Sequence, residues 1–289
     1  MRRSAVIAGC CVALGLLPGC AAVRQRRELA AEAPEMALRR QQLSQAATSA
    51  MDRGDYPQAR ADLEKLLVQT PSSAELHYRL GKVLQFQNDL GGAENEFRRA
   101  LILEPHYVGA LVGLGQIDAR MDRPAEALCR FEKAIEVEPH RAEAHFARGK
   151  TLETLGRRDD ALAAYFRSLE LDPASPPAIV RVAAIQLDRG QPEQALVRLD
   201  QATELSPEDA DVRFQRGLTL LALNRPGSAI SDLKFAAENL TGRADVLLVL
   251  ARAFEADRKP EQARLAAERA LHLQPESPVA REISERLRR

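Results

Sequence analysis

Residues 74–107 read AELHYRLGKVLQFQNDLGGAENEFRRALILEPHY, and three features of this stretch return along the chain every 34 residues. A proline stands at Pro71, Pro105, Pro139, Pro173, Pro207 and Pro275, with Thr241 at the skipped step. An alanine stands at Ala59, Ala93, Ala127, Ala161, Ala195, Ala229 and Ala263. A small residue stands at Ala47, Gly81, Gly115, Gly149, Ala183, Gly217 and Ala251. Three series in phase indicate internal repeats, which begin at Arg40, Ala74, Val108, Ala142, Pro176, Ala210 and Ala244.

Each copy contains two helical patterns separated by a turn. In the quoted copy, Leu76, Leu80 and Leu84 recur at helical spacing and predict one apolar face. The small residues are expected where the two helices cross, because a larger side chain would push them apart. The turn holds residue types that tolerate a left-handed backbone: Gly54, Asn88, Asp122, Gly156, Gly190 and Asn224, with Arg258 as the exception. The second helix is expected to start at Pro124, Pro192, Pro226 and Pro260 and to end before the period-ending prolines.

This pattern resembles the tetratricopeptide repeat, a helix–turn–helix unit of the same length. The residues that carry the resemblance in the quoted copy are Leu80, Gly81, Leu84, Ala93, Phe97, Ala100 and Pro105. The resemblance covers residues 40–277 and implies an all-α fold, an α-solenoid with a right-handed superhelix of seven repeats (40–73, 74–107, 108–141, 142–175, 176–209, 210–243 and 244–277). Such an array needs a polar end, so residues 278–289 are expected to form a capping helix with Val279, Ile283 and Leu287 facing inward.

The composition argues against several classes of function. The chain has 41 basic and 41 acidic residues among 289, so no strong field points to nucleic acid. The repeats leave no room for a catalytic domain, and no nucleotide-binding, HExxH or GxSxG motif occurs. We therefore expect no catalytic residue, metal, cofactor or small-molecule substrate. His77 and His145 share one repeat position and are expected to be packing residues, and Cys129 is expected on the outer surface.

The first residues have the pattern of an export signal. Arg2 and Arg3 precede an uncharged, mostly apolar run that ends in Leu17-Pro18-Gly19-Cys20. This ending resembles the lipobox of bacterial lipoproteins, which implies a signal peptide over 1–19 and acyl chains on Cys20. An uncleaved anchor, or a cleaved signal without lipidation, is the alternative.

Residues 20–39 are expected to form a tether between the anchor and the repeats. Arg24, Arg26 and Arg27 lie near the anchor, where they could contact anionic headgroups. The other interpretation is a solvated helical spacer that is interrupted at Pro34.

The family resemblance also implies a binding surface. In this family the first helices of the repeats line the concave face, and the fifth and ninth positions of each repeat usually point into it. The expected peptide-binding groove comprises Tyr78, Lys82, Val112, Gln116, Phe146, Lys150, Val180, Phe214 and Leu248. An apolar stripe edged by lysines suits an extended peptide or an amphipathic helix. Alternatively, these residues pack only against neighbouring helices. A carboxylate clamp is not expected, because Tyr78 stands where such a clamp has a lysine.

Three charged residues occupy positions where the pattern expects apolar ones, namely Asp118, Arg148 and Arg216. An unpaired buried charge is costly, so one hypothesis pairs Asp118 with Arg148 across adjacent repeats. The other is that both side chains reach solvent.

Together these patterns predict a non-catalytic protein–protein interaction scaffold. The export signal places it in the cell envelope, lipid-anchored and facing the periplasm or extracytoplasmic side, on the outer membrane in a didermic bacterium. It resembles repeat lipoproteins that serve as pilotins for secretins or as adaptors for cell-wall enzymes. A self-associating structural protein, or a soluble cytoplasmic adaptor, remains the alternative.

Overall fold

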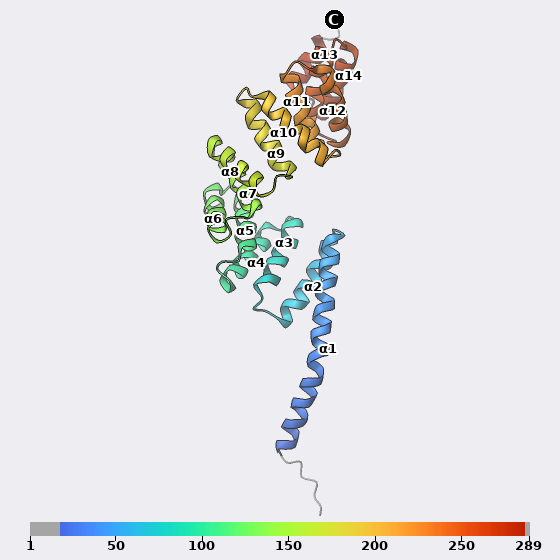
Figure 1. Ribbon diagram of the computed structural model, residues 1–289. Helices are drawn as coiled ribbons and strands as arrows, with labels where there is room; N and C mark the ends of the chain where they lie inside the picture. The colour runs from blue at the N-terminus through green and yellow to red at the C-terminus, as the bar shows by residue number, and fades with distance from the viewer. Residues whose placement is uncertain (1–17, 287–289) are drawn as a thin grey trace, which may run out of the picture. The chain divides into compact units, whose positions relative to one another are not determined.

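The computed structural model describes the backbone of residues 18–286 and the side chains of residues 34–286, all helices and connecting turns (Figure 1). The described chain divides into two compact units, one up to Leu103 and the other from Glu104. The first unit contains α1 (Pro18–Asp52), α2 (Tyr56–Gln69), α3 (Ala74–Phe86) and α4 (Leu90–Leu103). The second contains α5 (Val108–Arg120), α6 (Pro124–Val137), α7 (Ala142–Thr154), α8 (Arg158–Leu171), α9 (Pro176–Asp188), α10 (Pro192–Leu205), α11 (Ala210–Ala222), α12 (Pro226–Asn239), α13 (Ala244–Ala256), α14 (Pro260–Leu273) and α15 (Pro278–Arg286).

The helix boundaries follow the repeat period. The first helices of the second to seventh repeats begin at the residues that the period predicts, and the proline-initiated second helices begin at the predicted prolines. The residue between the two helices of each repeat has a positive φ in all seven cases, including Arg258 at 58°. The fold therefore imposes the left-handed turn even where the sequence provides no glycine, asparagine or aspartate. Each second helix ends two residues before the period-ending position, and α12 does so although that position holds Thr241.

Within each unit, consecutive helices pack as antiparallel hairpins, and the crossing glycines face large side chains of the partner helix. A Cβ atom added to Gly81 or Gly115 would lie 2.7 Å from the ring of Phe97 or Phe131. At Gly149 the corresponding distance to Tyr165 is 2.6 Å. The predicted close crossing is confirmed, and its cause is a bulky core side chain that occupies the volume of the missing methyl group.

A side-chain hydrogen bond joins alternate repeats to the preceding turn. The donors are His77, His145, Arg213 and Arg281, which bond the backbone carbonyls of Pro71, Pro139, Pro207 and Pro275 at 2.7–3.0 Å. The intervening repeats carry an aliphatic residue at the same position, Leu43, Leu111, Ile179 and Leu247. Both histidines are buried, as expected, and His77 also contacts Glu96, with Nδ1 2.6 Å from Oε2. These contacts satisfy proline carbonyls that lie two residues beyond the ends of the second helices.

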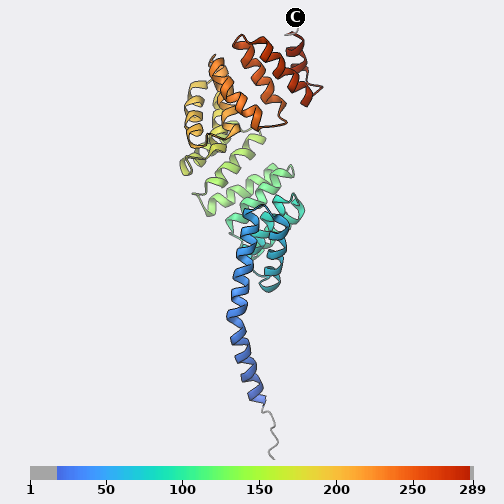
Figure 2. The same ribbon diagram turned by 90° about the vertical axis from the view of Figure 1, so that its right-hand side faces the viewer.

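The first helix is longer than its repeat requires. α1 runs from Pro18 through Pro34 without a break, so the predicted interruption at Pro34 is wrong. The N-terminal part of α1 extends beyond α2, as both views show (Figure 2). The predicted signal peptide lies almost entirely outside the described residues, as does the side chain of Cys20. In the part of the chain that the structure describes, no helix is both long and apolar enough to span a bilayer.

The last helix closes the second unit. α15 buries Ala280 and Ile283, and Val279 packs against the same apolar cluster. The charged side chains on the opposite side of α15 are exposed, which is the arrangement expected of a cap, while Leu287 lies outside the described residues.

Candidate protein-binding groove

In the first unit, the predicted groove residues Tyr78 and Lys82 lie on α3 and are half-buried. The ring of Tyr78 is tilted against Phe97, with centroids 6.0 Å apart. The ammonium of Lys82 lies 5.4 Å from the ring centroid of Phe86. Both side chains contact aromatic residues of their own unit and keep part of their surface exposed.

In the second unit, two predicted groove residues belong to the core instead. Val112 is 2% exposed and Phe214 is 9% exposed, so neither offers a surface to a partner. The guanidinium of Arg243 covers Phe214 at 4.8 Å from the ring centroid. Leu248 is half-buried against the core of the last repeats. Gln116 is also half-buried, and its side-chain amide donates a hydrogen bond to a carboxylate on α7. For Val112 and Phe214 the packing alternative therefore holds, because the fifth position turns inward there.

The structure brings Phe146, Lys150 and Val180 together in one groove of about 340 Å³. Phe146 and Lys150 come from α7 and Val180 from α9, and two prolines at the start of α9, Pro176 and Pro177, complete its apolar wall. α9 packs closely against α11 but not against α7, so the groove opens between α7 and α9. We call this the α7–α9 groove.

The acidic residues at the edge of the α7–α9 groove are already engaged. Asp209 caps α11 by accepting hydrogen bonds from the backbone amides of Asp211 and Val212. The carboxylate of Asp211 accepts a hydrogen bond from Arg243 at 2.9 Å. Both carboxylates therefore have hydrogen-bond partners within the chain.

Of the basic residues, Lys150 is the one left to a partner. Arg181 lies 3.6 Å from Oε1 of Glu153, whose other oxygen accepts a hydrogen bond from the hydroxyl of Tyr165 at 2.7 Å. Burial, followed by this hydrogen bond, raises the pKa of Tyr165, so its hydroxyl remains a donor. Lys150 is exposed and has no ion pair among the described residues. The α7–α9 groove thus presents an apolar wall beside one free ammonium group.

Sequence reasoning did not find Pro176, Pro177 and Arg181 as groove residues. Pro176 was expected only as the first residue of a repeat, and Arg181 follows the predicted Val180 by one residue. A signal existed in helix geometry, since Pro176 and Pro177 lie four and three residues before the fifth position, and Arg181 lies three residues before the ninth. The separation of α7 from α9, which opens the groove, has no counterpart in the sequence.

Neither hypothesis for Asp118 and Arg148 is correct. Asp118 is 3% exposed and lies 2.8 Å from Arg123 and 3.7 Å from Arg130. Arg148 is half-buried, with its guanidinium 3.8 Å from Glu132. Each charge thus has a partner on α6 or at its start. That partner lies closer than the residue of the adjacent repeat with which the first hypothesis paired it.

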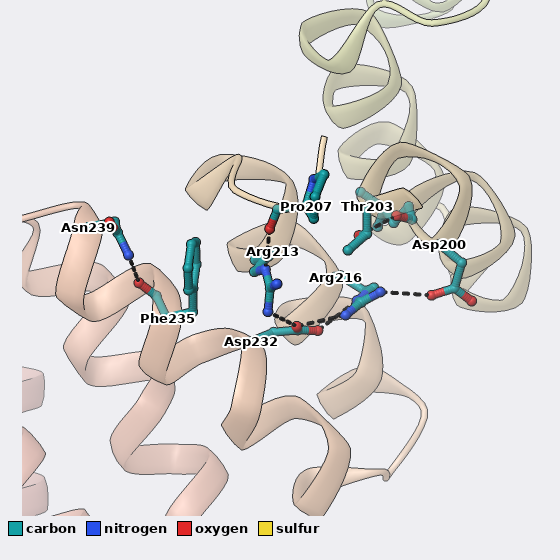
Figure 3. Close-up of polar contacts among 9 residues, drawn as sticks. Asp200, Thr203, Pro207, Arg213, Arg216, Asp232, Phe235 and Asn239 are labelled. Atoms are coloured by element: carbon teal, nitrogen blue, oxygen red, sulfur yellow. Dashed lines mark hydrogen bonds and ion pairs between the residues drawn. The ribbon is translucent and has the colours of Figure 1, made fainter. Parts of the chain in front are cut away.

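Arg216 lies at the centre of a third network (Figure 3). Its Nε and Nη2 atoms donate to the two carboxylate oxygens of Asp232 at 2.7 Å each, and Asp232 is 2% exposed. Arg213 lies 3.7 Å from the same carboxylate and stacks on Phe235. The hydrogen bond to Asp232 raises the pKa of Arg216. This network is a structural ion pair, and it leaves no charged group free for chemistry.

Cys129 is exposed, as predicted, and has no disulfide partner among the described residues. Across residues 34–286, no three histidine, cysteine, aspartate or glutamate side chains come together as a metal site. What the arrangement can provide is contact area and fixed charge.

Comparison with known proteins identifies the architecture. A family model of the tetratricopeptide repeat matches residues 44–108 and 113–176, and a second model of the same repeat matches residues 152–216. Together the matches cover more than half of the chain. The chain belongs to the tetratricopeptide repeat family. Proteins of this family generally mediate protein–protein interactions through a non-catalytic scaffold.

Solved structures share the tetratricopeptide repeat fold at low identity. A chain of the APC/C hetero-tetramer Cut9–Hcn1 aligns with a TM-score of 0.71 and 16% identity, over 83% of this chain and 51% of that chain. Pseudomonas aeruginosa pilF aligns with a TM-score of 0.67 and 18% identity, over 74% of this chain and 97% of that chain. YrrB, described as a TPR protein with an unusual peptide-binding site, aligns with a TM-score of 0.53 and 20% identity, over 65% of this chain and 97% of that chain.

One curated relative shares a short segment. The probable biofilm formation methyltransferase WspC of Pseudomonas putida is 38% identical over 64 residues, which cover 22% of this chain. The matched segment spans only 15% of WspC, and this chain spans about half of the Cut9–Hcn1 chain.

Proposed function

We propose that this protein is a lipid-anchored envelope scaffold that binds a peptide or helix of another protein in the α7–α9 groove. The observation that carries the proposal is the exposed ammonium of Lys150 beside the apolar wall of Phe146 and Val180. A partner would place an apolar side chain against the wall and a carboxylate near Lys150. Burying one large apolar side chain contributes roughly 1.5–3 kcal/mol. Several such contacts are needed to exceed the entropy that the partner loses when it becomes ordered on binding.

The groove is tested by a charge reversal with a matched control. Lys150→Glu on α7 and Lys133→Glu on α6 make the same change of charge at exposed lysines, but only Lys150 lines the groove. Cross-linking in intact cells, with mass spectrometry of the captured proteins, is expected to lose a defined set of partners with Lys150→Glu and to keep it with Lys133→Glu. Retention of every partner by Lys150→Glu would rule out the α7–α9 groove.

The anchor is the second part of the proposal. Residues 1–19 would act as the export signal, and Cys20 would carry acyl chains on the extracytoplasmic side. Support comes from α1, since residues 20–39 lie on one continuous helix. At about 1.5 Å per residue, that segment would hold the repeats about 30 Å from the anchor.

Membrane fractionation of Cys20→Ala tests the anchor. The wild-type protein is expected in the membrane fraction, with an acylated N-terminal peptide by mass spectrometry, and Cys20→Ala in the soluble fraction. Unchanged membrane association of Cys20→Ala, without any acylated peptide in the wild type, would refute lipidation and leave the α7–α9 groove untouched.

A further inference from the structure

A second hollowed surface lies in the last two repeats, among α12, α13 and α14. Two adjoining pockets of about 320 Å³ each share Ala237 of α12 and Arg269 of α14. We call them together the outer groove. Alanines stand on both sides of it, Ala237 on α12 and Ala266 on α14, so the floor is formed by Leu250 and Phe254 of α13. No residue of the α7–α9 groove takes part.

Leucines extend the apolar surface of the outer groove toward solvent. Leu265 is 53% exposed and Leu273 is 45% exposed, and each lines one of the two pockets. They stand on α14, on either side of Arg269. An apolar side chain entering either pocket would therefore lie close to the guanidinium of Arg269.

The charge around the outer groove is one-sided. Arg269, His272 and Lys234 line it and have no ion pair among the residues that the structure describes, and Lys234 only covers the ring of Phe254 at 5.6 Å. Arg243, at one end, is engaged with Asp245 at 2.6 Å. The lining contributes one carboxylate, Glu238, against the cations Arg269 and Lys234.

A comparison within the chain shows why Arg269 has no carboxylate partner three residues further on. In the fourth repeat the positions of Arg269 and His272 hold Arg167 and Glu170, which form an ion pair at 2.7 Å. In the third to sixth repeats the position of His272 always holds a glutamate. The seventh repeat replaces the glutamate with His272, so Arg269 lacks the neutralising partner that Arg167 has.

We propose that the outer groove binds an acidic, leucine-rich segment of another protein, with its apolar side chains in the two pockets and a carboxylate on Arg269. Charge complementarity favours this partner, since opposite charges across an interface steer association and fix its register. The last residues of this chain, Leu287-Arg288-Arg289, have the same sign of charge as the groove and do not match it. The proposal is independent of the α7–α9 groove.

The test uses short random peptides displayed on phage and selected on the full chain. The selected peptides are expected to combine aspartate or glutamate with leucine, isoleucine or phenylalanine within one helical turn. Fluorescence anisotropy then gives their affinities for the wild type, Arg269→Glu, Lys150→Glu and Lys133→Glu. Lys133 occupies the same repeat position on α6 as Arg269 on α14 and is the matched control.

Arg269→Glu is expected to weaken binding at least about tenfold, whereas Lys150→Glu and Lys133→Glu leave it unchanged. Because Arg269 is exposed, its reversal should leave the thermal unfolding curve in place. Three results would overturn the proposal: peptides without acidic residues, affinities indifferent to Arg269→Glu, or loss of binding with Lys150→Glu instead. Arg269-dependent binding to phosphatidylglycerol vesicles alone would assign the surface to lipid, and Arg269-dependent dimerisation would assign it to a second copy.

Discussion

The contact between Gly115 and Phe131 permits a quantitative test of how the repeats pack. A methyl group at Gly115 would lie 2.7 Å from Cε1 and 2.9 Å from Cζ of Phe131, whose side chain is 1% exposed. The ring has no free space to move into, so overpacking should cost about 2–3 kcal/mol. Replacing a helical glycine with alanine recovers about 1 kcal/mol of helix propensity. Gly115→Ala should therefore lower the free energy of unfolding by about 1–2 kcal/mol.

The same chain suggests the compensating change. Where the small position holds Ala47 or Ala183, the facing residues are Leu63 and Leu199, and all four are fully buried. Phe131→Leu alone should cost about 1 kcal/mol, because it leaves part of the ring volume empty. In the double variant the new methyl group fills that volume, so the two losses should not add. We expect a coupling energy of about 1–2 kcal/mol in favour of the double variant.

Urea denaturation followed by far-ultraviolet circular dichroism measures all four proteins of this cycle. Gly91→Ala is the control, since Gly91 is an exposed helical glycine with nothing within 4 Å of an added Cβ atom. It should leave stability unchanged or raise it by up to about 1 kcal/mol. If Gly115→Ala also stabilised the protein, or if its loss simply added to that of Phe131→Leu, the packing argument would be refuted.

Three further predictions follow from local contacts. Arg258 is exposed at φ 58°, where three other repeats have glycine. Arg258→Gly should therefore raise the free energy of unfolding by about 0.5–1 kcal/mol and move the urea midpoint upward. A lower midpoint would contradict the strain argument. Asp232→Ala should cost about 3 kcal/mol in the same assay, because it leaves two arginines of a buried network without their shared carboxylate; a loss below about 1 kcal/mol would mean that solvent already screens them. The hydrogen bond from Gln58, aided by Lys65, lowers the pKa of Asp62, so its contribution is present above the unfolded pKa of about 4 and is lost as the pH falls below it. Asp62→Asn should therefore lose less stability than the wild type in urea titrations between neutral pH and about pH 3, and equal losses would contradict this assignment.

The fold was largely predictable because every repeat carries its own copy of the pattern that specifies it. The prolines, the crossing glycines and the turn residues each appear several times. The other copies therefore establish the pattern even where one repeat has an exception such as Arg258 or Thr241. In both cases the backbone adopts the shape that the period requires. Neighbouring hairpins impose this geometry because each apolar face is buried only by the next one.

The candidate sites were less predictable, since they depend on differences between repeats. Val112 and Val180 share one repeat position, yet Val112 is buried and Val180 lines the α7–α9 groove. The difference comes from the spacing of neighbouring helices, which a single position does not encode. The ion pairs of Asp118 and Arg148 escaped prediction for a related reason. Each bonds a nearby helix through a long arginine side chain, and such side chains reach several alternative partners.

The two proposed surfaces share one electrostatic feature, a basic residue without an ion pair. In five of the seven repeats, all of which the structure describes, an arginine faces a carboxylate three or four residues away, as Arg167 faces Glu170. Such pairs contribute little stability, but they cancel the field that would attract an acidic partner. A scaffold with a formal net charge of zero can be selective only where this cancellation fails. It fails at Lys150 and at Arg269, and at both places an apolar pocket lies beside the free cation. An apolar pocket alone would accept many partners, and a cation alone would bind each of them weakly. Their coincidence at these two points is the physical reason to place binding there.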